Sequence, residues 1–593
     1  MRKYPVLAVL ALCLCALSAF AQGPYYSCSG RNILGPDGQP FQIRGNDLSH
    51  WQNTEAYALR LNAVHSRHLG SESSIKTRIR EIVGVTNAAK FWNTFQSNFV
   101  TQADVADFSA EGFNTIRFSF NYRLVSPQDT PGQYSSEGFA FMDKVVQWCA
   151  ANDLAVILDM HACPGGQSHD GPADPEWTYW YWSDAITNWL ETGVPCLWQS
   201  NADYYATTGR TPEFNKQRTA DIWREIANRY KDEPAILGYE LMNEAWLPAD
   251  AGVEDLRAAL IQITDAIREV DANHIIMVGG DLFGGSLEGL VPPWDSNMVL
   301  CFHRYWTPTT QATIQPFLDV AIQHNVPLCV TESGENSNPW LYEFAQLLEA
   351  NNIGWCMWGY KKVDNIASAF SAYVTPDYQY VIDNFRDLPI NATRANKGLM
   401  ECATNVLTAK CAFDPGWFDA LLSPQFNTQP YAFVTHTLPC KINCVNYDVG
   451  NQGLAYSDTR YKNPDGLYGA PYNSGWKYRN DGVDVNTTSE AGGFKVSWVD
   501  SNERLKFTVN VSQAAKYDIY IRTASPNSTG RLQLYWDGAP LTSVISVPKT
   551  GGWDNFRATT VKGFNLTAGQ HVLEARFTVG GFDISSIEFK KAR

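Results

Sequence analysis

Two acidic residues stand directly after short apolar runs that are typical of buried strands. Glu244 follows Asn243 beyond the run 236–241, and Glu332 ends the run 326–332. In a (β/α)8 barrel the active site is built from the C-terminal strand ends, so both acids could face one cleft. Two carboxylates flanking a cleft can act on a glycosidic bond, one as the acid and the other as nucleophile or base. For a single strand-end acid, the alternative is a role at a helix N-terminus or on the surface.

Glu335 is the alternative to Glu332 as the second carboxylate of the pair. It lies three residues further along, whereas the apolar run of the strand ends at Val330. Because barrel active sites are built at the strand ends, Glu332 is the favoured partner of Glu244.

Short apolar runs alternate with amphipathic helical patterns from about residue 24 to residue 400. This alternation favours a parallel α/β architecture. A helix is predicted over 219–231, where Ile222, Trp223 and Ile226 share one stripe. We predict a (β/α)8 TIM barrel whose largest loop, 164–215, is expected to wall the cleft. The eight predicted strands fall within 41–51, 112–118, 155–161, 236–241, 274–279, 298–303, 326–332 and 352–358.

The strand-end motifs resemble those of glycoside hydrolase family 5, the cellulase-type family. In chain order they are Asn243-Glu244, His303-Arg304-Tyr305 and Thr331-Glu332-Ser333-Gly334. The resemblance implies a retaining mechanism with Glu332 as the nucleophile and Glu244 as the acid/base. Two departures are modest, since Ala245 follows Glu244 in place of the usual proline and Thr331 precedes Glu332 where glycine is common.

The same resemblance implies supporting roles for residues of the second, third and fourth strands. Arg117 would hydrogen-bond the nucleophile and keep it ionised, and His161 matches the family's third-strand histidine. Asn243 would hold the sugar 2-hydroxyl. The alternative for Arg117 is a buried ion pair without a catalytic part, and for His161 it is a structural histidine.

The sixth and eighth strands supply the remaining implied residues. His303 and Tyr305 match the family's sixth-strand pair, with Tyr305 close to the nucleophile. Trp358 would form the floor of the −1 subsite, and Trp355 is the alternative for that role.

After residue 440 the pattern changes to short alternating strands separated by turns rich in glycine. Strands are expected at 505–511, 517–522, 531–535 and 571–577, which together predict an all-β jelly-roll sandwich. This part resembles carbohydrate-binding module family 6 over nearly its whole length. The match is carried by 447–450, 455–458, 478–484, 550–553 and 580–583.

The second resemblance also implies a sugar site. Tyr478 and Trp553 would be its aromatic residues, and Asp583 stands where that family usually has asparagine. The acidic pair that helps that family to hold a structural calcium is missing, because the corresponding stretch 442–446 reads Ile-Asn-Cys-Val-Asn. No metal or cofactor is predicted, and a structural calcium in this domain is the open alternative.

Residues 1–21 resemble a signal peptide. Arg2 and Lys3 precede an apolar run over 6–17 and the small-residue end 19–21, and the run is too short for a membrane span. An extracellular or periplasmic location is expected. The net charge of −15 argues against nucleic acid and anionic membrane as partners. The aromatic content of 13%, with 20 tryptophans, suits a polysaccharide partner, and we expect a monomer.

Export permits disulfides. The chain has 13 cysteines, including Cys13 and Cys15 in the signal peptide, so an odd number remains. Cys402 with Cys411 and Cys163 with Cys196 are candidate local pairs, but sequence does not fix connectivity. The chain contains neither a CxxC pair nor an HExxH motif, which argues against a zinc site of those kinds.

These observations predict a secreted retaining β-glycoside hydrolase, with endo-action on a β-1,4-glucan as the first choice of substrate. Mannan, xyloglucan, xylan and exo-action on β-1,3-glucan are alternatives, and the non-enzyme alternative is a polysaccharide-binding protein. The predicted domains are a signal peptide over 1–21, a barrel over 22–400, an ordered linker over 401–439 and a sandwich over 440–593. The sandwich is expected to be a targeting module that can be removed without loss of chemistry, or else a spacer that stabilises the barrel.

Overall fold

The computed structural model describes residues 24–61, 70–168, 171–173, 210–248, 251–386, 388–463 and 472–592. The predicted signal peptide, Cys196 and most of the loop 164–215 lie outside the described residues. Within the described ranges, no helix is both long enough and apolar enough to cross a membrane.

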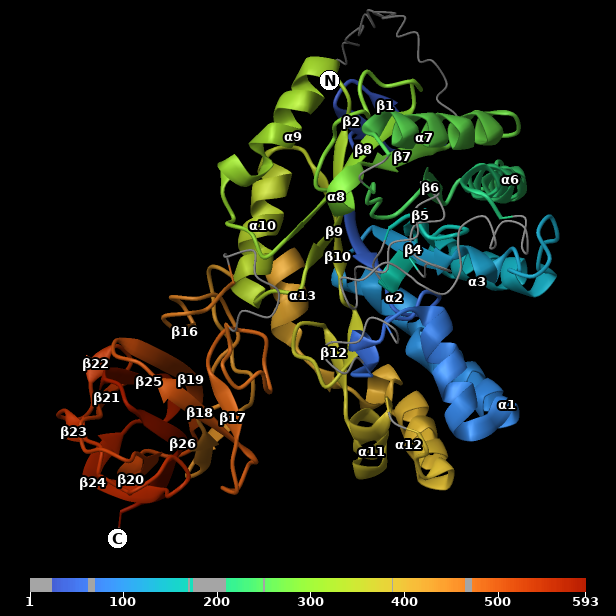
Figure 1. The fold of residues 1–593 in the computed structure, drawn as a ribbon. Helices are drawn as coiled ribbons and strands as arrows, with labels where there is room; N and C mark the ends of the chain where they lie inside the picture. Colours follow the sequence, from blue (N-terminus) through green and yellow to red (C-terminus); the bar gives the residue numbers. More distant parts are fainter. Residues whose placement is uncertain are drawn as a thin grey trace, which may run out of the picture.

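Eight parallel strands close into a barrel in the order β10-β3-β4-β5-β6-β7-β8-β9, which confirms the predicted (β/α)8 fold (Figure 1). The ring is closed by β10, which pairs in parallel with both β3 and β9. The strands are β3 (Arg44–Asp47), β4 (Thr115–Asn121), β5 (Ala155–Ala162), β6 (Ile236–Glu240), β7 (Ile275–Gly279), β8 (Met298–Tyr305), β9 (Leu328–Gly334) and β10 (Gly354–Trp358).

The barrel strands are buried on both faces, which explains their continuous apolar runs. Every residue of β4 and β5 is buried. The floor of the barrel is a cluster of apolar and thiol side chains that includes Ile157, Leu237 and Cys356. A Cβ at Gly45 would lie 2.4 Å from the Sγ of Cys356, so this close approach of strands requires glycine. Charged side chains occupy the other level of the barrel, toward the C-terminal strand ends.

Helices surround the barrel on the outside (Figure 1). The helix predicted over 219–231 is longer, since α6 spans Pro212–Tyr230. Its start is fixed by the Thr211 side chain, which accepts a hydrogen bond from the Phe214 N–H, and by proline in the first turn. The other helices are α1 (Glu72–Phe99), α2 (Gln102–Glu111), α3 (Ser136–Ala150), α7 (Val253–Arg268), α8 (Asp281–Gly284), α9 (Gln311–His324), α10 (Asn338–Ala350), α11 (Pro376–Asn384), α12 (Ala392–Asn405) and α13 (Pro415–Leu422).

The C-terminal domain is a sandwich of two sheets around its own core, as predicted. One sheet has the order β14-β19-β25-β21-β22 and the other has the order β17-β18-β26-β20-β24. The strands are β14 (His436–Leu438), β17 (Val485–Thr487), β18 (Phe494–Val499), β19 (Glu503–Val511), β20 (Ala515–Ala524), β21 (Arg531–Trp536), β22 (Ala539–Pro540), β24 (Arg557–Leu566), β25 (Gly569–Val579) and β26 (Phe582–Lys591).

The segment 401–439 differs from the predicted linker. Helix α12 continues to Asn405, and α13 places Trp417 and Phe418 in the hydrophobic core of the barrel. Phe426 also belongs to that core, so the barrel domain extends well beyond residue 400. The periodicity is lost in the sequence because α13 is only 8 residues long. In Figure 1 it lies beside α10, on the side that faces the sandwich.

The predicted pair of Cys402 and Cys411 is not a disulfide in this structure, where both thiols are free. Cys402 is buried in α12, whereas the Sγ of Cys411 donates to the carbonyl oxygens of Asn405 and Leu407, both at 3.5 Å. The second predicted pair cannot be assessed, because Cys196 lies outside the described residues.

Candidate active site

The end of β9 places Glu332 inside the barrel, where both of its oxygens accept hydrogen bonds. Oε1 accepts from Nη1 of Arg117 at 2.7 Å, and Oε2 accepts from the hydroxyl of Tyr305 at 3.0 Å. The Glu332 side chain is only 5% exposed. These contacts join three predicted site residues from three different strands, β4, β8 and β9.

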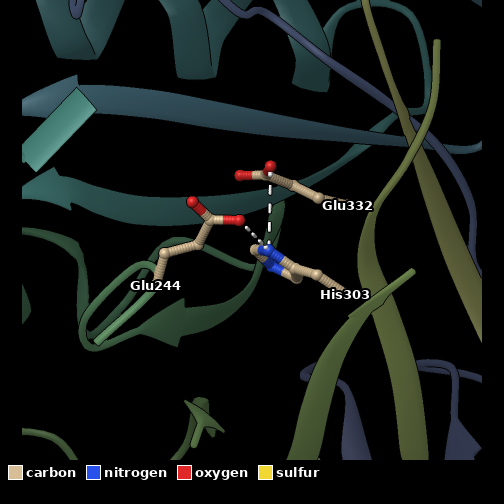
Figure 2. Close-up of side chains that lie close together, drawn as sticks. All are labelled: Glu244, His303 and Glu332. Atoms are coloured by element: carbon tan, nitrogen blue, oxygen red, sulfur yellow. Dashed lines mark hydrogen bonds and ion pairs between the residues drawn. The ribbon is translucent and has the colours of Figure 1, made fainter. Parts of the chain in front are cut away.

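Glu244 lies just past the end of β6 and faces Glu332 across His303 (Figure 2). Its Oε1 is 2.8 Å from Nδ1 of His303, and that nitrogen is 3.7 Å from Oε2 of Glu332. One oxygen of each carboxylate and one nitrogen of His303 all lie within 4.8 Å of one another. Glu244 is the more exposed acid, with 18% of its side chain accessible. Two carboxyl groups at this spacing can act together on one glycosidic bond.

His161 and Asn243 form a second hydrogen-bonded layer beside Glu332. Nδ1 of His161 lies 2.7 Å from Oδ2 of Asp159, and its Nε2 lies 3.3 Å from Nδ2 of Asn243. Burial is the main cause that lowers the pKa of His161 to about 3, so the ring is neutral. The neutral ring can donate from Nδ1 to Asp159 and accept from the Asn243 amide at Nε2.

Trp358 stands at the end of β10 and stacks on the His161 ring, with centroids 5.1 Å apart and planes 11° apart. Its Nε1 donates to the hydroxyl of Tyr57 at 2.9 Å. Trp355 instead belongs to the outer core, where its Nε1 donates to Glu349 at 3.2 Å. The structure thus brings Trp358 to the site and leaves Trp355 away from it.

Glu335 is bonded to other groups. Its carboxylate accepts from the Tyr57 hydroxyl at 2.8 Å and pairs with Nζ of Lys362. Its backbone has a left-handed φ of 50°, and its carbonyl accepts from Nε1 of Trp306 at 3.0 Å. The Glu335 carboxylate is therefore held by Tyr57 and Lys362.

Burial and neighbouring groups shift the pKa of Glu332 in opposite directions. Burial raises the pKa of Glu332, while its electrostatic interactions with His303 and Arg117 act to lower it. Burial raises the pKa of Tyr305 well above its usual value, so its hydroxyl stays protonated and can donate to Glu332. Burial is also the main cause that lowers the pKa of His303.

Comparison with known proteins agrees with this arrangement. Residues 77–364 match the family described as Cellulase (glycosyl hydrolase family 5). The barrel belongs to glycosyl hydrolase family 5. Residues 476–591 match the family described as Carbohydrate binding module (family 6), to which the sandwich belongs.

The relatives that this chain matches are distant. A Beta-xylosidase of Phanerodontia chrysosporium is 28% identical over 320 residues, covering 54% of this chain and 59% of that protein. Endoglucanase C of Acetivibrio thermocellus is 26% identical over 210 residues, covering 35% of this chain and 50% of that protein. The chain thus spans about half the length of these curated relatives. The solved endoglucanase Cel5A from Thermotoga maritima is 18% identical with a TM-score of 0.33, covering 44% of this chain and 82% of that one.

Three buried acids that bind Arg117 were not among the predicted site residues: Asp47, Asp159 and Glu240. Arg117 is fully buried and donates to Glu240 at 2.6 and 3.0 Å and to Asp47 at 3.0 Å. Its Nη2 also lies 3.0 Å from Oδ2 of Asp159. Asp159 interrupts the apolar strand β5, and Asp47 and Glu240 are the last residues of β3 and β6. The available signal was an acid within or at the end of a predicted buried strand, because a buried charge requires a partner.

Glu244, His303 and Glu332 are also, among the described residues, the group whose spacing could hold a metal ion. Hydrogen bonds already account for this arrangement, since both Glu332 oxygens accept from protein donors and Nδ1 of His303 lies against Glu244. The donor set therefore fits a pair of acting carboxylates without requiring an ion.

In the family 6 sandwich the predicted sugar site is only partly accessible. Tyr478 and Trp553 are 36% and 46% exposed, as a stacking surface requires. Asp583 is only 3% exposed, and its Oδ2 pairs with Nζ of Lys495 at 2.9 Å. Lys495 also donates to the carbonyl of Trp553 at 3.0 Å. The expectation that Asp583 supplies the polar contact to sugar is thus not supported, because this buried carboxylate is bound to its counter-ion.

Proposed function

We propose that this chain is a retaining β-glycoside hydrolase in which Glu332 is the nucleophile and Glu244 the acid/base. The observation that carries the proposal is the close approach of the two carboxylates, which have oxygens within 4.8 Å of each other. Retaining enzymes hold their carboxyl groups about 5–5.5 Å apart, whereas inverting enzymes need about 6.5–9.5 Å to admit a water.

In the first step Glu332 attacks the anomeric carbon while Glu244 protonates the leaving glycosidic oxygen. The C–O bond to the leaving sugar breaks, and an ester bond to Glu332 forms. Arg117 and Tyr305 donate to the two Glu332 oxygens, so they orient the nucleophile for attack. Burial raises the pKa of Glu332, and the Arg117 charge opposes this, which favours the ionised form that attacks.

In the second step Glu244 accepts a proton from water, and the resulting nucleophile displaces Glu332 from the anomeric carbon. The configuration of the sugar is retained because two inversions occur in sequence. Asn243 is held by Arg117 at Oδ1 and by His161 at Nδ2. An amide nitrogen carries two donors, so the second N–H of Asn243 can meet the sugar 2-hydroxyl. Trp358, stacked on His161, supports the floor of the −1 subsite in this proposal.

The first substrate candidate is a β-1,4-glucan cleaved within the chain. It is favoured by the family 5 barrel and by the relative named Endoglucanase C. The second candidate is exo-action, favoured by relatives named Beta-xylosidase and Probable glucan 1,3-beta-glucosidase A. The polysaccharide is the expected partner of both domains, with Tyr478 and Trp553 as exposed stacking residues of the sandwich. We further propose that the chain is secreted and acts as a monomer.

A reducing-sugar screen over glucan, mannan, xyloglucan, xylan and laminarin tests this proposal. Release of oligosaccharides indicates endo-action, and release of monosaccharide alone indicates exo-action. Glu244→Gln and Glu332→Gln should each abolish hydrolysis, while Glu225→Gln on the exposed face of α6 should leave it unchanged. Proton NMR of the first product should show the β-anomer. Inverted product, or folded protein that hydrolyses none of these glycans, would contradict the proposal, the second result favouring a binding protein.

A further inference from the structure

A buried layer of asparagine and aspartate side chains joins the sandwich domain to the barrel. All six side chains of this layer, here called the amide interface, are buried. The barrel contributes Asn336 and Asn338, which follow β9, and Asp414, which precedes α13; the sandwich side contributes Asn463, Asn480 and Asp481.

Asn336 forms a two-way pair with the backbone of Asn463. Its Nδ2 donates to the Asn463 carbonyl at 2.7 Å, and its Oδ1 accepts from the Asn463 N–H at 3.0 Å. An amide side chain that both donates to and accepts from one backbone residue fixes the distance between the two segments, as a hydrogen-bonded residue pair does between two β-strands.

Asn480 reaches the same loop from the other domain. Its Nδ2 donates to the backbone carbonyl of Asn336 at 2.8 Å and to Oδ1 of Asn338 at 3.0 Å. The N–H of Asn338 donates back to the Asn480 carbonyl at 2.8 Å. The hydroxyl of Tyr472 donates to Oδ1 of Asn480 at 2.5 Å, which fixes the orientation of that amide.

Two buried acids complete the amide interface. Nδ2 of Asn338 donates to Oδ2 of Asp414 at 3.1 Å and to Oδ1 of Asp481 at 2.9 Å. Asp481 pairs with Nη2 of Arg479 at 2.6 Å, and burial raises the pKa of Asp414 to about 6. Such a network is stabilising only while every member keeps its partner, so it specifies one relative placement of the two domains.

The loop held by the amide interface is the loop that leaves the active site. Asn336 is four residues after Glu332 and directly follows Glu335. Glu335 keeps a left-handed backbone, a strained conformation that persists only where the surrounding structure holds it. Through Tyr57, Glu335 connects to Nε1 of Trp358. Hydrogen bonds at Asn336 and at the Glu335 side chain, linked by the peptide bond between these two residues, therefore connect the sandwich with Tyr57 and Trp358.

Two further contacts support the same placement. Nζ of Lys477 lies 3.2 Å from Oδ2 of Asp364, which also pairs with Arg60. Nζ of Lys462 lies 2.5 Å from Oε2 of Glu343 on α10. The sandwich therefore contacts the barrel beyond β10 and on α10 as well as behind the loop after β9.

We propose that the sandwich domain is a positioning element of the active site, with Asn480 as the residue that holds the loop after Glu332. This inference rests on the proposed hydrolase function and contradicts a freely tethered targeting module. A tether raises only the local concentration of a polymer, so its loss leaves small soluble substrates unaffected. Loss of a positioning contact slows every substrate, since a displacement of about 1 Å can reduce the rate by about 100-fold.

The test compares Asn480→Ala with the matched control Asn565→Ala in the full chain. Asn565 is exposed on β24, which lies on the side of the sandwich away from the barrel (Figure 1). Hydrogen–deuterium exchange of the segment 333–341 is measured together with kcat and KM on cellotetraose at 20 °C. Asn480→Ala should exchange at least about tenfold faster there and lose about tenfold in kcat with little change in KM, while Asn565→Ala matches the wild type.

Tyr472→Phe is the second variant, in case Asn480→Ala does not fold. It removes one hydroxyl from a buried ring and should raise exchange of 333–341 and lower kcat by about threefold. Unchanged exchange and kcat within twofold of the wild type in either folded variant would overturn the proposal. A wild type that hydrolyses no glycan would refute the hydrolase function alone, because the exchange measurement still decides whether Asn480 holds the loop.

Discussion

Replacing Arg117 with lysine tests whether the guanidinium group organises the active site by its shape as well as its charge. Arg117 is fully buried and donates to Glu240 twice, to Glu332 at 2.7 Å and to Asp47 at 3.0 Å. A lysine ammonium keeps the charge but presents three donors from a single point. It cannot reach carboxylates that approach from several strands at once.

The expected loss of stability follows from these contacts. At least two buried carboxylates lose a charged donor in Arg117→Lys, and each unsatisfied group costs about 1–3 kcal/mol or more. We therefore expect the free energy of unfolding to fall by about 3–5 kcal/mol, as for other broken buried ion pairs. The Arg117 charge also opposes the burial that raises the pKa of Glu332. With the ammonium further away, the pKa of Glu332 should rise and the acidic limb of kcat/KM should move to higher pH.

Urea unfolding and the pH dependence of kcat/KM measure the two effects. The matched control is Arg229→Lys, whose bidentate pair with Asp143 lies on the surface and should contribute less than about 1 kcal/mol. Arg117→Lys should also lower kcat by about 100-fold through misplacement of Glu332. An unchanged acidic limb together with an unfolding free energy within about 1 kcal/mol of the wild type would refute this account of Arg117.

Three further substitutions have distinct expected outcomes. Glu332→Gln removes a carboxylate whose pKa burial raises, and such a group lowers stability above its folded pKa. Calorimetry at pH 8 should therefore show a higher Tm for the variant than for the wild type, and this gain should shrink as the pH falls; a Tm below that of the wild type at pH 8 would contradict the argument. Glu335→Gln leaves the buried Lys362 without its counter-ion, so the free energy of unfolding in urea should fall by about 1–3 kcal/mol while some hydrolysis remains. Complete loss of activity in folded protein would instead favour Glu335 as the nucleophile. Trp553→Ala should lower the affinity of the chain for polysaccharide in gels by about fivefold, for roughly 1 kcal/mol of stacking, and leave kcat on cellotetraose unchanged. Equal mobility of variant and wild type in every gel would leave no sugar-binding role for this residue.

The barrel was predictable because its strands follow a simple physical pattern. A parallel strand buried on both faces gives a continuous apolar run, and polar residues where the run stops mark the active-site end. This is how Glu244 and Glu332 were found although 88 residues separate them along the chain. The helix α6 was predicted too short because its first turns are polar and depend on the cap at Thr211.

The remaining features depend on tertiary partners that lie far apart in the chain. Asp47 and Glu240 accept hydrogen bonds from Arg117, although they lie 70 and 123 residues from it along the chain and no local pattern links them. Asp583 was expected at a sugar site, but its partner Lys495 is 88 residues earlier in the chain and becomes adjacent only when β18 pairs with β26. Amide side chains such as Asn480 carry no periodic signal, so the amide interface was read as part of a separate module.

Active-site labelling tests the central claim most directly. A 2-deoxy-2-fluoro glycoside of the sugar identified in the screen slows hydrolysis of the covalent intermediate, and proteolysis with mass spectrometry then locates the ester. The account predicts stoichiometric labelling of Glu332, prevented by Glu332→Gln and unaffected by Glu225→Gln. Labelling of Glu335 or Glu244, or full hydrolytic activity without any labelled residue, would contradict it.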